Sequence, residues 1–109
     1  MSKPIKRKKT KQSHYPLSEV KDKVKNGKLL IKPNAEFRAY QDFAWSITDI
    51  KSALLKLSAK DFQKTEPSEK IPGVFLDFYK AYINKENVYT HFYINRITNT
   101  LIINSFHEQ

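Results

Sequence analysis

The chain has 109 residues, enough for one domain with a modest core. It contains no cysteine, which excludes disulfide frameworks and thiolate metal sites. Its apolar runs are too short for a membrane span, and its charged N-terminus is not followed by the apolar segment of a signal peptide. We therefore expect a cytoplasmic protein that does not associate with membranes.

The net charge of +9 comes from 20 basic and 11 acidic residues, and six of the basic residues precede Gln12. Basic proteins of this size often bind nucleic acid, because neutralised phosphates release counterions. Residues 1–13 are polar and show no periodicity, so we expect a disordered basic tail before a single domain over residues 14–109. Its residues Lys6, Arg7, Lys8 and Lys9 are candidate RNA contacts. The alternative is a tail that only solubilises the domain.

The first half of the chain predicts helices. Leu17, Val20 and Val24 recur at helical spacing, and Gly27 is suited to end that helix. Residues 28–32 predict a short strand. Phe37, Tyr40 and Phe43 then favour one short helix.

A further helix is predicted over residues 47–58. Ser46 can cap its first turn, with Asp49 three residues later. We expect this helix to pack on the rest of the domain through the apolar residues that recur at helical spacing, namely Ile47, Ile50, Leu54 and Leu57.

The second half of the chain predicts strands. Residues 74–83, 87–94 and 100–106 are rich in aromatic and β-branched residues and are joined by short turn-like segments. Residues 61–66 predict one more strand. Helices followed by an antiparallel meander indicate an α+β fold, with helices packed on a mainly antiparallel β-sheet.

Alternation assigns two faces to the strand over 87–94. Val88, Phe92 and the residues in phase with them suit a core. Tyr89, His91 and Tyr93 point the other way, and their rings and polar atoms could stack on RNA bases and contact phosphates. The alternative is an ordinary solvated sheet face.

The residues available for chemistry favour metal-free acid–base catalysis. With only two glycines, the chain has no phosphate-binding loop. His91, His107 and Asp77 match no metal-ligand spacing, so no metal or cofactor is expected. Lysine, tyrosine and histidine remain. RNA suits them, because its own 2′-hydroxyl can attack the adjacent phosphate and the protein need only move protons and stabilise charge.

Several segments in order resemble the MqsR family of toxins, which are mRNA endoribonucleases of type II toxin–antitoxin modules with a RelE-like fold. These segments are YPLSEVKDKVKNGKL, LKLSAKDFQK, FLDFYK, VYTHFYI and LIINSFHE, which together span about residues 14–109. The resemblance implies a sequence-specific mRNA interferase with a cognate antitoxin. It also implies a monomer or a toxin–antitoxin hetero-oligomer. The alternative from another class is a non-catalytic RNA-binding or interaction domain on the same fold.

The resemblance also implies which residues form the active site. The family's active-site lysine falls on Lys64 and its tyrosine on Tyr89. The family's C-terminal lysine falls on His107, and its glutamine falls on Leu76. His91 shares a strand face with Tyr89 and is a candidate that the family pattern does not supply.

Strand geometry gives a separate test of this site. If paired residue numbers of the last two strands add to an even value, Tyr89 and His107 share a face, while Ile102 and Phe106 join the core. We therefore expect Lys64, Tyr89 and His107 to converge on one patch with His91 at its border. The same register predicts that Leu101 and Ile103 face the site.

Overall fold

The computed structural model describes residues 12–109, which form three α-helices and five strands. The α+β prediction is confirmed. In chain order the elements are α2 (Leu17–Lys25), β1 (Leu29–Ile31), α3 (Pro33–Phe43), α4 (Ile47–Leu55), a short 3₁₀ turn (Ala59–Asp61), β2 (Phe62–Pro67), β3 (Phe75–Ile83), β4 (Glu86–Asn95) and β5 (Thr100–Glu108).

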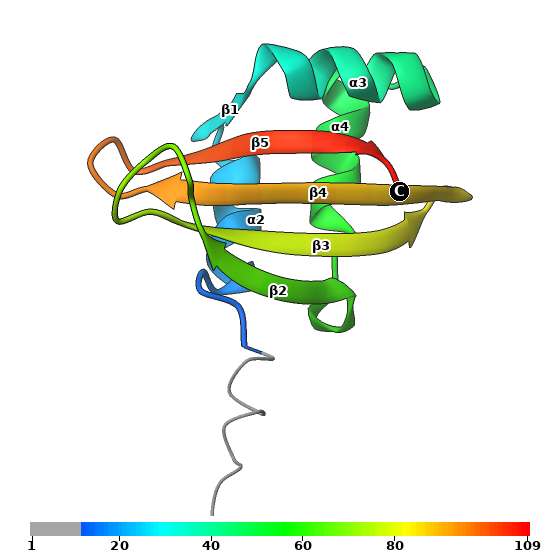
Figure 1. Cartoon of the computed structure of the whole chain (residues 1–109). Helices are drawn as coiled ribbons and strands as arrows, with labels where there is room; N and C mark the ends of the chain where they lie inside the picture. Colours follow the sequence, from blue (N-terminus) through cyan, green and yellow to red (C-terminus); the bar gives the residue numbers. More distant parts are fainter. Residues whose placement is uncertain (1–11) are drawn as a thin grey trace, which may run out of the picture.

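The five strands form one sheet in the order β1-β5-β4-β3-β2. The contacts from β2 through β5 are antiparallel, and β1 pairs with β5 in parallel. Helices α2 and α4 lie behind the sheet in Figure 1, and α3 runs along β5 at the upper edge. Along residues 12–109, no helix covers the opposite face of β2 to β5 (Figure 1).

Helix α4 begins as predicted but ends early. Ser46 and Asp49 form a reciprocal capping box at its start. The helix ends at Leu55 rather than residue 58, although Leu57 is still buried. Ile50 and Leu54 pack in the core, whereas Ile47 is 40% exposed, so its predicted core role is wrong.

Helix α3 is confirmed, but it buries a different face from the one its aromatic residues suggested. Phe37 and Tyr40 are 62% and 68% exposed, while Ala35 and Ala39 are fully buried and Phe43 is nearly so. Small alanine side chains allow the helix to lie close to its neighbours. The large rings that set the helical spacing are therefore left on the outer surface.

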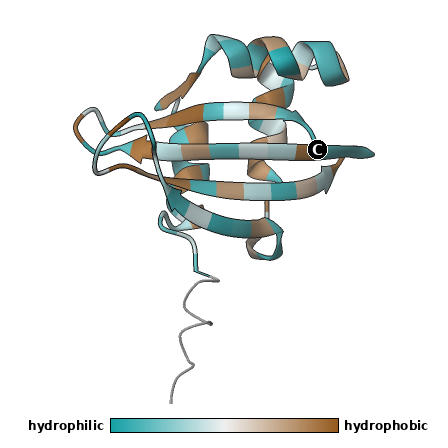
Figure 2. Cartoon of the chain, in the orientation of Figure 1, coloured by the Kyte–Doolittle hydropathy of each residue, from teal (hydrophilic) through white to brown (hydrophobic). Residues whose placement is uncertain are grey.

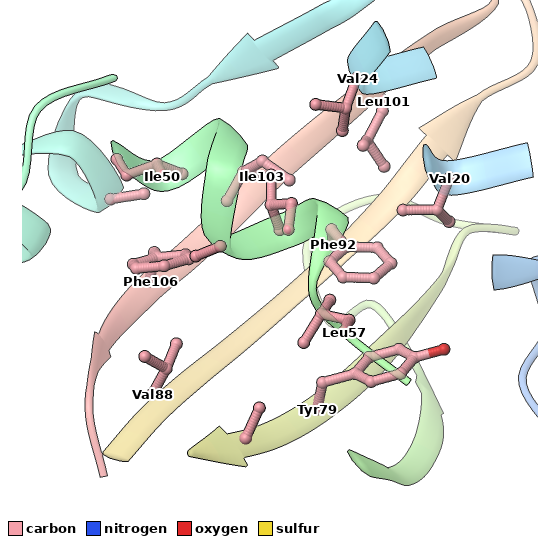
Figure 3. Packing of buried hydrophobic residues seen from close by; sticks show 14 of the residues in the cluster. Val20, Val24, Ile50, Leu57, Tyr79, Val88, Phe92, Leu101, Ile103 and Phe106 are labelled. Carbon is pink, nitrogen blue, oxygen red and sulfur yellow. The ribbon is translucent and has the colours of Figure 1, made fainter. Parts of the chain in front are cut away.

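The core fills the space between the helices and the sheet (Figure 3). On β4 the predicted core residues Val88 and Phe92 are buried there. Bands of opposite hydropathy alternate along the strands in Figure 2, as expected for strands that bury one face.

A β-bulge near Asn104 in β5 changes the predicted register. Tyr89 pairs with His107 and His91 with Ser105, but Phe92 pairs with Ile103. The predicted even sum therefore holds only on the C-terminal side of the bulge. On the other side Leu101 and Ile103 are fully buried in the core, so their predicted place on the site face is wrong. One extra residue lets β5 bury apolar groups on both sides of the irregularity.

Asp77 is a fully buried carboxylate on the helix side of the sheet. It accepts the backbone N–H groups of His14 and Tyr15 at 3.0 and 2.9 Å and the Thr65 hydroxyl at 2.5 Å. These three bonds join β2, β3 and the segment before α2. A buried carboxylate needs such donors to offset its lost hydration.

Asp77→Asn is expected to destabilise the domain by about 2–4 kcal/mol, because the new amide N–H₂ would face backbone donors. Urea denaturation measures the change in the free energy of unfolding. The matched control is Asp22→Asn on the exposed surface of α2, which is expected to alter stability by no more than about 0.5 kcal/mol. Equal effects of the two substitutions would contradict the anchoring role of Asp77.

Candidate active site

Two cross-strand rows cover the open face of the sheet. One row runs from Lys64 on β2 through Phe78 and His91 to Ser105 on β5. The next row contains three residues from β3, β4 and β5, namely Lys80, Tyr89 and His107. Lys64, Tyr89 and His107 thus share one face, and His91 lies inside the group rather than at its border.

Aromatic contacts hold these rows together. The rings of Tyr89 and His107 are 5.0 Å apart between centroids, and the His91 ring lies 4.5 Å from that of Phe78. The Lys64 ammonium lies 4.9 Å from the Phe78 centroid, close enough for a cation–π interaction. Phe78 is buried and supports the polar groups on either side of it.

The hydrogen bonds of Asn104 define the protonation of His91. The Lys32 ammonium can only donate, so it donates to the Asn104 carbonyl oxygen, at 2.8 Å. The Asn104 amide nitrogen therefore faces His91 Nδ1, at 3.1 Å, and donates to it. Nδ1 is consequently unprotonated, and the neutral imidazole carries its proton on Nε2.

His91 is also electrostatically held in its neutral form. Burial lowers the pKa of His91 to about 4, and the positive charges of His107 and Lys32 act in the same direction. At neutral pH His91 therefore presents a neutral Nε2–H donor, not a titrating acid or base.

His107 has the opposite arrangement. Its Nδ1 lies 2.7 Å from the carbonyl oxygen of Glu108, which can only accept, so Nδ1 carries the proton. In the neutral ring Nε2 then has a free lone pair. The chain end is also anchored, since the Glu108 N–H donates to the Asp42 carboxylate at 2.9 Å. His107 therefore belongs to an ordered strand rather than to a frayed terminus.

Lys64 is exposed and paired with Glu66, with 2.9 Å between Nζ and the carboxylate oxygen. The hydrogen bond from Lys64 to Glu66 raises the pKa of the lysine, so the ammonium stays charged at neutral pH. A lysine in this setting suits charge stabilisation better than base catalysis.

Tyr93 and Leu76 lie beside these rows and line a cavity of about 310 Å³ with Lys32, Asn104 and the segment Glu66–Ile71. Tyr93 is only 7% exposed. Its ring is therefore not the open stacking surface that was predicted, and it forms part of the cavity wall instead. Leu76, where the family resemblance implies a glutamine, supplies an apolar side chain to the cavity wall.

Four residues of this face were missed by the sequence analysis: Phe78, Lys80, Asn104 and Lys32. Lys80 lies 6.0 Å from the Tyr89 ring centroid. Alternation along the strand over 74–83 could have identified Phe78 and Lys80, because both are in phase with Leu76. Asn104 could not be found this way, since the bulge interrupts the alternation at that residue.

The remaining predictions concern the basic N-terminal residues and a possible metal site. Lys6, Arg7, Lys8 and Lys9 lie outside the described residues. Asp77 is on the helix side of the sheet, opposite His91 and His107, so these three cannot share a ligand. Within residues 12–109 no three His, Asp or Glu side chains are grouped so as to hold a metal ion.

A larger hollow of about 630 Å³ lies between α3 and the start of α4 and is lined by exposed apolar residues including Phe37, Tyr40 and Ile47. Its lining includes one carboxylate, that of Glu36. The hollow shares no lining residue with the two rows.

Along residues 12–109, no helix has the length and apolar character needed to cross a bilayer.

The model of a family described as "Motility quorum-sensing regulator, toxin of MqsA" matches residues 12–108, nearly the entire chain. No curated protein is significantly similar to the chain.

The free energy of unfolding is expected to fall as the pH is lowered from about 6.5 to about 4. In this window unfolded His91 binds a proton and folded His91 does not, so acid favours the unfolded state. Urea denaturation at several pH values measures the slope, and His91→Gln should reduce it. An NMR titration of His91 with a midpoint above pH 6 would contradict the neutral form described above.

Proposed function

The chain belongs to the MqsR toxin family, and from this membership we propose that it is an mRNA endoribonuclease of a type II toxin–antitoxin module. One observation carries the chemical part of the proposal: two histidines with opposite tautomers share a sheet face with Tyr89 and Lys64. One histidine offers a proton donor and the other a proton acceptor.

In the proposed reaction His107 Nε2 removes the proton from an RNA 2′-hydroxyl. The 2′-oxygen attacks the adjacent phosphorus and forms a crowded, doubly charged phosphorane. The His91 Nε2–H donates a hydrogen bond to one of its oxygens, and Lys64 stabilises its charge. Tyr89, between the two histidines in the rows, orients the phosphate.

The leaving 5′-oxygen takes its proton from the side opposite His107, as in-line displacement requires. Lys64 is on β2 and His107 on β5, so β3 and β4 lie between them. The Lys64 ammonium supplies the proton and is recharged from solvent. The products are a 2′,3′-cyclic phosphate and a 5′-hydroxyl, and no step of this reaction uses a metal ion.

The proposed partner is a cognate antitoxin, as the family description "toxin of MqsA" suggests. We propose that the toxin acts in the cytoplasm on mRNA, as a monomer when free and as a hetero-oligomer when blocked.

Incubation of the purified protein with a structured mRNA in excess EDTA tests the reaction. Cleavage should persist, and the new termini should carry a cyclic phosphate and a 5′-hydroxyl. Loss of cleavage in EDTA would overturn the metal-free mechanism. Binding without any cleavage, with or without Mg²⁺, would favour a non-catalytic RNA-binding domain.

Lys64→Ala is expected to lower the cleavage rate by about 10²–10³-fold, the range for loss of one charge-stabilising donor.

His107→Ala should lower the cleavage rate by about 10²–10⁴-fold and remove one limb of the pH–rate profile. His107→Lys, which introduces the family's residue, should retain partial activity with a shifted optimum. The control is Lys51→Ala on the exposed surface of α4, which should leave the rate unchanged. An unaltered pH profile in His107→Ala would remove His107 from the mechanism.

Deletion of residues 1–11 should weaken RNA binding for all sequences alike, since it removes six positive charges. Binding measured at several salt concentrations should show a flatter dependence, while the cleavage positions stay the same. A changed set of cleavage positions would show that the tail reads sequence.

A further inference from the structure

The cavity beside Tyr93 is contiguous with the proposed catalytic rows. It shares Phe78 with them directly, and two of its lining residues contact them: Glu66 pairs with Lys64, and Asn104 bonds to His91. Its volume of about 310 Å³ is at the lower end of the range for small-ligand pockets. A nucleotide whose phosphate rests on the rows would therefore have this hollow next to it.

The lining of the cavity combines apolar walls with a few polar groups. Leu76, Phe78 and Tyr93 provide aliphatic and aromatic surface. The polar lining comprises two lysines, two glutamates, a serine and an amide, namely Lys32, Lys70, Glu66, Glu69, Ser68 and Asn104. This combination suits a flat, polar-edged ring better than a phosphate, because half of the wall is apolar and the two carboxylates offset the two lysines.

Asn104 has hydrogen-bonding capacity that its protein contacts do not use. A carboxamide has two N–H donors and two lone pairs. One lone pair accepts from Lys32 and one N–H donates to His91, and Asn104 makes no other side-chain hydrogen bond within residues 12–109. One N–H donor and one acceptor lone pair therefore remain, on an amide whose orientation Lys32 and His91 fix.

We propose that this cavity is a nucleobase subsite in which Asn104 reads the Watson–Crick edge of one base next to the cleaved phosphate. The edge of every nucleobase presents a donor and an acceptor in adjacent positions, which a fixed amide can match in one orientation only. The subsite rests on the proposed function for its place beside the scissile phosphate. It makes Asn104 the residue that sets base preference at one position of the target.

Two measurements test the subsite, and the first needs no enzymatic activity. Each of the four nucleoside 3′-monophosphates is titrated into ¹⁵N-labelled protein, with inorganic phosphate as the base-free probe. One nucleotide should bind at least about 5-fold more tightly than the weakest of the four and shift the amide signals of Tyr93, Asn104 and Ile71. Asn104→Ala should abolish this difference. Equal binding of all four nucleotides, or the same shifts with inorganic phosphate, would overturn the base subsite.

The second measurement sequences the cleaved ends of a random RNA pool. Asn104→Ala should flatten the base preference at a single position next to the cut, and Asn104→Asp, which keeps the acceptor for Lys32 but loses the N–H donors, should change it. The control is Asn87→Ala, an exposed asparagine of β4 that does not line the cavity, which should keep the wild-type preference. Unchanged preference in both Asn104 variants would overturn the subsite while the ribonuclease proposal stands. If the wild-type protein cleaves no RNA, the ribonuclease proposal fails, and the nucleotide titration still decides the subsite.

Discussion

The bulge in β5 is the constraint on which the candidate site depends. A strand without it would alternate strictly, and a register that buried Leu101 and Ile103 would also turn His107 into the core. One extra residue reverses the phase, so Phe106 is buried and His107 lies opposite Tyr89. The same irregularity brings Asn104 to His91. Bulges often redirect side chains beside functional sites, and this bulge places two of them.

The two histidines show how hydrogen-bond partners divide roles between identical side chains. His91 receives a bond at Nδ1 and so keeps its proton on Nε2, while His107 gives up its Nδ1–H to a carbonyl and keeps Nε2 open. Burial and the neighbouring cations reinforce the neutral state of His91. Backbone and amide groups thereby fix which imidazole nitrogen carries the proton in each neutral ring.

Much of the fold could be predicted from the sequence because the strands carry strong period-two patterns and α4 carries a capping box. The errors arose where the size of a side chain, or one extra residue in a strand, mattered more than hydrophobicity. In α3 the alanines, rather than Phe37 and Tyr40, face the core, since only small residues fit the close contact. The bulge could not be predicted, because no single residue type signals an extra position in a strand. The resemblance to a family pointed to Lys64, Tyr89 and His107, whereas the support from Lys32 and Asn104 emerged only from three-dimensional contacts.

The central strands divide most of their residues between a face that packs in the core and a face that carries the candidate site. The polar groups of the second face, such as His107, Lys80 and Lys64, are absent from the hydrophobic core. Substitutions at these three positions are therefore expected to cost little folding free energy. Such a surface is free to acquire new target preferences, or to lose its chemistry, while the scaffold stays intact. In chains of this architecture, a correctly folded domain therefore does not by itself indicate that the toxin is active.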